Sequence, residues 1–180
     1  AVLPANAGRG EIGAGMGYKT PTLFTEETET MQYRNVEQLN KVKSEKSYGG
    51  TADVNFRTNI SNDFTLTLNH MFFFTWIDVP LILEEYTNNA YRFINANKPV
   101  QSAGFETNAR FIYKDRFKLF LGYTFTNTKA KYLSGNQFLP LVPRDKLNTA
   151  LIYEKEEVIK IGLEGYFTGK QYLSDGTRTP

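Results

Sequence analysis

The sequence predicts an all-β protein whose strands, about seven in number, are antiparallel and run up and down as part of a large transmembrane β-barrel. Three observations predict this fold. Apolar and polar side chains alternate in segment after segment, which is the period of an extended strand. Short turns alternate with long connections along the chain, and the apolar set of each expected strand contains no Asp, Glu, Lys or Arg.

The first three expected strands cover residues 11–19, 47–57 and 64–78. The third, FTLTLNHMFFFTWID, alternates most clearly, with threonine and asparagine between its apolar side chains. In chain order, the apolar face of these strands consists of Ile12, Ala14, Met16 and Tyr18, then Tyr48, Ala52, Val54 and Phe56, then Phe64, Leu66, Leu68, His70, Phe72, Phe74 and Trp76.

The remaining strands are expected within residues 105–113, 117–125, 146–153 and 158–167, and they repeat the same pattern. Their apolar face consists of Phe105, Ala109, Phe111 and Tyr113, then Phe117, Leu119, Leu121, Tyr123 and Phe125, then Leu147, Leu151 and Tyr153, then Ile159, Ile161, Leu163 and Phe167.

The connections between the expected strands alternate in length. Tight turns are expected at residues 61–62, 114–116 and 154–157, and long connections over residues 20–46, 79–101 and 129–144. Because the chain reverses direction at every turn, all the long connections then lie at one end of the sheet. Outer-membrane barrels are typically built this way, with short periplasmic turns and long extracellular loops.

The charge-free face does not by itself separate a membrane barrel from a soluble β-sandwich, since a sandwich core excludes charge as well. The order of side chains along the face favours the barrel. Aromatic residues lie near the strand ends with Ala, Val, Leu and Ile between them, and eight residues of a tilted strand span roughly 20 Å, close to the height of a barrel's apolar band. The residues expected to face lipid include Leu66, Leu68, Phe72, Trp76, Leu119, Leu121, Leu151 and Ile161. Those expected to line the lumen are Asp53, Asn55, Arg57, Glu106, Asn108, Arg110, Lys118, Lys160 and Glu164.

Composition excludes several other classes of function. The chain of 180 residues has a formal net charge of +2 and no basic run, so no nucleic-acid partner is expected. It has no cysteine, hence no thiolate metal site, and no nucleophile–base arrangement, hence no enzyme activity, metal or cofactor is expected. The only histidine, His70, is expected to be neutral and packed on the apolar face.

Several stretches of the sequence carry a family resemblance. They are GMGYKTPTLFTEE (residues 15–27), RNVEQLNKVKSEKSYGGTADVNF (34–56), YRFINANKPVQSAGFETNARF (91–111), LPLVPRDKLNTALIYE (139–154) and GLEGYFTGKQYLSDG (162–176). In this order they resemble segments of the C-terminal β-barrel of TonB-dependent outer-membrane receptors. The resemblance implies a parent barrel of about 22 strands, plugged by an N-terminal domain, in the bacterial outer membrane.

The resemblance also implies a function and partners. Such a receptor binds a scarce small molecule or metal chelate, for example a ferric siderophore, haem or cobalamin, and imports it with energy supplied by the TonB complex. Residues 1–180 are then expected to be one partial barrel domain surrounded by outer-membrane lipid, an excised piece without the plug, the TonB-contacting N-terminal part and the closing strand. A passive porin and a soluble β-sandwich binding module or adhesin are the alternatives.

Ligand contacts are expected in the long connections, where aromatic faces and cations can hold an anionic chelate. The candidate residues are Tyr86, Tyr91, Arg92, Lys131, Tyr132 and Arg144.

Overall fold

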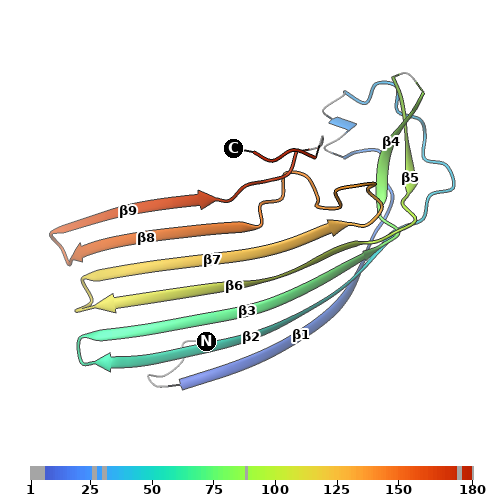
Figure 1. The fold of residues 1–180 in the computed structure, drawn as a ribbon. Helices are drawn as coiled ribbons and strands as arrows, with labels where there is room; N and C mark the ends of the chain where they lie inside the picture. The colour runs from blue at the N-terminus through green and yellow to red at the C-terminus, as the bar shows by residue number, and fades with distance from the viewer. Residues whose placement is uncertain (1–6, 26–27, 30–31, 88, 174–175, 180) are drawn as a thin grey trace.

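The computed structural model describes residues 7–25, 28–29, 32–87, 89–173 and 176–179. In these ranges the chain forms strands β1 to β9 (Figure 1). Their bounds are β1 Ala7–Lys19, β2 Glu45–Ser61, β3 Phe64–Asp78, β4 Leu81–Thr87, β5 Ala90–Asn95, β6 Val100–Tyr113, β7 Phe117–Ala130, β8 Asp145–Lys155 and β9 Ile159–Thr168. No helix in the described part of the chain has the length and hydropathy needed to cross a membrane.

Seven strands form one antiparallel sheet in the order β1-β2-β3-β6-β7-β8-β9, so strands that follow one another along the main sheet are neighbours in space. The turns β2–β3, β6–β7 and β8–β9 lie at one end of the sheet, and the three long connections lie at the other (Figure 1). The predicted up-and-down order and the one-sided long connections are therefore confirmed. Strands β1 and β9 are the edges of the sheet, which is not closed in the described part of the chain.

The registers between strands align the two predicted sets of residues on opposite faces of the sheet. One row across five strands consists of Leu66, Phe111, Leu119, Leu151 and Leu163. A row on the other face consists of Asn55, Asn69, Asn108, Gly122, Asn148 and Tyr166. We call the first face the apolar face and the second the polar face. That the apolar face meets lipid and the polar face lines a lumen stays a prediction.

The apolar face has no second protein layer over it in the described residues. Ile12 is 90% exposed, Phe72 56% and Leu163 72%, although all three are large apolar side chains. The buried apolar residues of the described chain, Phe93, Ala96, Val100 and Ala130, lie at the long-connection end instead. A β-sandwich buries such a face against another sheet about 10 Å away. The sandwich alternative is therefore wrong for this fold.

The connection between β3 and β6 was expected to be a long loop, and it contains a hairpin. Strands β4 and β5 pair there as a separate antiparallel sheet of two strands (Figure 1). Asn89 adopts a left-handed φ of 66°, a conformation that asparagine tolerates at turns. The β1–β2 connection packs against this hairpin through a parallel bridge between Val36 and Tyr91.

Candidate ligand-binding site

The three long connections enclose a cavity of about 470 Å³ at their end of the sheet. Lys19, at the end of β1, and Glu45, at the start of β2, are ladder partners on the polar face and form part of its wall. The cavity thus opens on the polar side of the sheet, and its volume is within the range of small-molecule sites. Its lining residues are Lys19, Thr20, Pro21, Thr22, Thr25, Glu45, Leu81, Ile82, Leu83, Glu84, Phe93, Tyr132, Leu133, Leu139 and Pro140.

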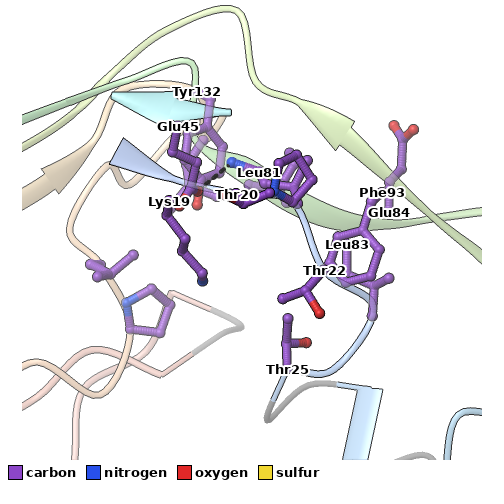
Figure 2. Close-up of a pocket in the computed structure, with 15 residues that line it drawn as sticks. Lys19, Thr20, Thr22, Thr25, Glu45, Leu81, Leu83, Glu84, Phe93 and Tyr132 are labelled. Atoms are coloured by element: carbon purple, nitrogen blue, oxygen red, sulfur yellow. Dashed lines mark hydrogen bonds between the residues drawn. The ribbon is translucent and has the colours of Figure 1, made fainter. Parts of the chain in front are cut away.

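The walls of the cavity are mainly apolar, with a few polar groups among them. Leu81, Leu83 and Phe93 come from the β4–β5 hairpin, while Thr22 and Thr25 come from the β1–β2 connection. Figure 2 shows the Lys19 side chain extending into the space between these residues. An apolar pocket with a small number of placed polar groups is typical of a binding site for a small organic ligand.

The charged groups of the cavity differ in what they already contact. Glu45 Oε1 accepts a hydrogen bond from the Leu81 backbone N–H at 2.6 Å, which ties the hairpin to β2. Glu84 forms an ion pair with Arg92 at 3.2 Å. Lys19 forms no ion pair with any described residue. Lys19 is therefore the cation of this cavity that can meet an anionic or oxygen-rich group of a ligand.

Of the six predicted ligand contacts, Tyr132 lines the cavity directly. Tyr86 and Arg92 lie together on the hairpin, with the Arg92 guanidinium 4.9 Å from the centre of the Tyr86 ring. Arg92 reaches the cavity only through Glu84, its ion-pair partner. Tyr91 uses its backbone to hold the β1–β2 connection, because its N–H donates to Asn35 O and its carbonyl accepts from the Glu37 N–H, both at 2.9 Å.

The other two predicted contacts, Lys131 and Arg144, are not among the residues that line the cavity. The Lys131 ammonium lies 5.8 Å from the centre of the Trp76 ring. The Arg144 guanidinium lies 5.3 Å from the Phe125 ring and 5.4 Å from the Phe138 ring. Trp76 and Phe125 belong to the apolar face, so these two cations lie at its rim.

Side-chain contacts hold the hairpin over the cavity. The Asn95 Nδ2 group donates to the Lys43 and Val79 carbonyl oxygens, both at 3.0 Å, and Asn95 Oδ1 accepts from the Lys43 N–H at 2.6 Å. The Tyr86 hydroxyl donates to Glu37 Oε1. This hydrogen bond raises the pKa of the Tyr86 phenol above its usual value, with smaller contributions from burial and the Glu37 charge, while the Arg92 charge opposes them.

Most of the cavity could not be recognised in the sequence. Lys19, Thr22, Leu83 and Phe93 come from segments far apart in the chain, and their meeting depends on the β4–β5 hairpin. The Asn-Asn pair at residues 88–89, a turn signal between two short apolar runs, was the available sign of that hairpin. No group of three or more His, Asp or Glu side chains within the described ranges could hold a metal ion.

The fold of this chain is similar to part of the fold of known transporters. No protein-family model matches the chain, and no curated protein matches it. Solved structures do resemble it, among them two transporters. The FrpB iron transporter from Neisseria meningitidis (F3-3 variant) is 16% identical, with a TM-score of 0.68 over 97% of this chain and 27% of that one. The copper transporter OprC is 14% identical, with a TM-score of 0.67 over 94% of this chain and 25% of that one.

The similarity to these two transporters is a similarity of fold. The chain spans about a quarter of the length of the two transporters, and almost all of it superposes on them. The resemblance found in the sequence is therefore confirmed as a resemblance of fold to one stretch of a transporter chain.

Proposed function

We propose that this chain forms part of the barrel wall of an outer-membrane transport receptor that takes up a scarce ligand with energy supplied by TonB. The single observation that carries the proposal is the one-layer sheet with an apolar face on one side, whose charged residues lie only at the strand ends, and a polar face on the other. Such a face is stable in lipid, where an Arg or Lys at the bilayer midplane costs about 2–4 kcal/mol. The likeness to stretches of an iron and a copper transporter supports the same proposal.

The cavity among the long connections is the proposed entry site for the ligand. Lys19 and the hydroxyls of Thr22 and Thr25 would hold an anionic or oxygen-rich group, while Leu81, Leu83 and Phe93 would pack against an apolar part. Ferric siderophores, haem and cobalamin all combine polar oxygen atoms with an apolar or aromatic body. The ligand is thus one of this chemical class, and no covalent step is required of the receptor.

Binding to the complete protein that carries this sequence tests the cavity. The purified receptor in detergent is titrated with a ferric catecholate siderophore, a ferric hydroxamate siderophore, haem and cobalamin. Lys19→Gln is expected to weaken binding of the ligand that it takes by about tenfold, since a hydrogen bond to a charged group contributes about 1.5–3 kcal/mol. Lys98→Gln, an exposed lysine that does not line the cavity, is the matched control. If both variants bind the ligand with equal affinity, Lys19 and the cavity are not the binding site.

Uptake by cells separates active transport from the passive porin. Cells that carry the receptor are given the bound ligand in radiolabelled form, with an intact or an inactivated TonB complex. If the protein is an active-transport receptor, the cells should take up the ligand only when the TonB complex is intact. Equal uptake in both strains would favour the porin.

A further inference from the structure

A cluster of cations lies on the other side of the sheet from the cavity, at the long-connection end of the apolar face. We call it the cationic rim, and it consists of Lys129, Lys131, Arg144 and Arg178. Lys129 is the ladder partner of Gln101, which is itself the partner of Trp76, so these residues form one row across β7, β6 and β3. The next rows down the same face include Phe74, Phe72, Phe105 and Phe125.

Each cation of the rim lies over an aromatic ring. Arg144 is within 5.3 Å and 5.4 Å of the Phe125 and Phe138 ring centres, and Lys129 is 5.5 Å from the Phe138 ring. Phe138 stacks on Tyr172 with the ring centres 4.9 Å apart and the planes at 2°. Arg178 lies 4.6 Å from the Tyr172 ring. The rings hold the cations side by side, which a row of solvated lysines would not do.

The cations of the rim have no direct ion-pair partner among the described residues. Asp145, next to Arg144, accepts a hydrogen bond from the Tyr123 hydroxyl at 2.6 Å instead. The Nε–H of Arg144 is buried and has no hydrogen-bond partner among the described residues.

The position of the rim suggests which anion these cations meet. If the apolar face lies in lipid, as the proposed function requires, the rim lies at the height of the outer-leaflet headgroups. Lys and Arg near such a surface attract anionic lipid, and a guanidinium matches the geometry of phosphate oxygens. We propose that the cationic rim binds the phosphate of an outer-leaflet lipid headgroup, with Arg144 and Lys129 as the main contacts. The acyl chains of that lipid would then lie along Phe125, Phe105 and Phe72.

The test measures lipid retention by the complete protein in detergent micelles. The probe is lipid A, a glucosamine lipid with phosphate monoesters, and its comparison is the same lipid after removal of the phosphates. The rim variant carries Lys129→Gln, Arg144→Gln and Arg178→Gln. The control variant carries Lys114→Gln, Arg116→Gln and Lys155→Gln at the short-turn end, where Lys114 lies 5.4 Å from the Tyr113 ring in the same kind of contact. Native mass spectrometry counts the bound lipid, and heat-modified gel migration checks that each barrel is folded.

The expected result is that the rim variant loses lipid A binding by about fivefold for each charge removed, while the control keeps it. Arg144→Lys keeps the positive charge but not the planar guanidinium. It should therefore lose less lipid A binding than Arg144→Gln. Equal lipid retention by the rim and control variants would overturn the proposal, and so would equal retention of the dephosphorylated lipid. Displacement of lipid A by millimolar inorganic phosphate would assign the site to a free anion instead. The measurement needs neither ligand nor TonB, so its outcome is independent of the uptake experiment.

Discussion

The Phe73 ring lies against Gly104, its ladder partner on the neighbouring strand, so closely that a side chain at Gly104 has no room. A Cβ built on Gly104 would be 2.6 Å from Phe73 Cζ and would overlap the Phe125 carbonyl oxygen. The glycine therefore permits a large aromatic residue to lie on the polar face of β3, close to the cavity end of the sheet. Glycine within a strand often marks such a close approach.

Gly104→Ala should consequently destabilise the protein. Forcing a methyl group into this space moves the Phe73 ring or the β6–β7 ladder, and overpacking of this kind costs about 1–3 kcal/mol. The free energy of unfolding in urea and detergent measures the effect. Gly162→Ala is the matched control, because a Cβ there meets nothing within 4 Å. A Gly104→Ala protein as stable as the Gly162→Ala protein would show that the close approach is not needed.

Arginine at Leu66 or Leu121 should block assembly of the barrel. Both positions lie on the apolar face, where a charge at mid-membrane costs about 2–4 kcal/mol. Arginine at Thr65 or Thr124, on the polar face, should be tolerated. The folded fraction after insertion into lipid vesicles, taken from heat-modified gel migration, measures the difference. Equal folded fractions for the two pairs of variants would contradict the assignment of the faces.

Asn95→Ala should loosen the β4–β5 hairpin from the β1–β2 connection. The substitution removes three hydrogen bonds, to Lys43 and Val79, each with a net contribution of about 0.5–1.5 kcal/mol. Amide hydrogen exchange over residues 81–95 should become faster, while exchange in β6 and β7 stays as it was. Asn97→Ala, at an exposed position two residues further on, is the control. If exchange in the hairpin is unchanged, the hairpin is held in place by the apolar contacts of the cavity wall and not by the hydrogen bonds of Asn95.

The contact between Tyr86 and Glu37 should weaken in strong alkali. The folded pKa of Tyr86 is raised above the unfolded value of about 10, so the contact is fully present below that pH and is lost as pH rises through the folded pKa. A difference titration at 295 nm between the native protein and Tyr86→Phe isolates this phenol. Glu37→Gln should lower its pKa toward the ordinary value. A Tyr86 pKa that is the same in both backgrounds would show that Glu37 is not the cause.

The main sheet could be predicted from the sequence because its signals are local. In β3 and β7 the alternation of side chains fixes the strand, and the turn at residues 114–116 fixes the hairpin between β6 and β7. Each register then follows from matching the apolar positions, as the pairing of Leu119 with Phe111 and Leu151 shows. A slip by one residue would turn every apolar side chain to the other face.

The cavity and the cationic rim could not be predicted in the same way. Strands β4 and β5 are short, and Leu81, Ile82 and Leu83 are consecutive apolar residues without a period. Lys131 and Tyr132 are neighbours in the sequence, yet Lys131 lies over Trp76 while Tyr132 lines the cavity. Which way each side chain turns depends on contacts with distant segments, and no local pattern encodes those contacts.

One face of the sheet is proposed to meet lipid and the other to meet water, and alternate positions of β7 can distinguish the two environments. Single cysteines, each placed in turn at positions 118 to 122 of the complete protein with no other cysteine, are spin-labelled in outer-membrane vesicles. Power-saturation measurements then compare the accessibility of each label to oxygen and to a water-soluble nickel chelate. We expect high oxygen accessibility at positions 119 and 121, and high nickel accessibility at 118, 120 and 122. The same accessibility ratio at all five positions, or the reverse alternation, would contradict this expectation.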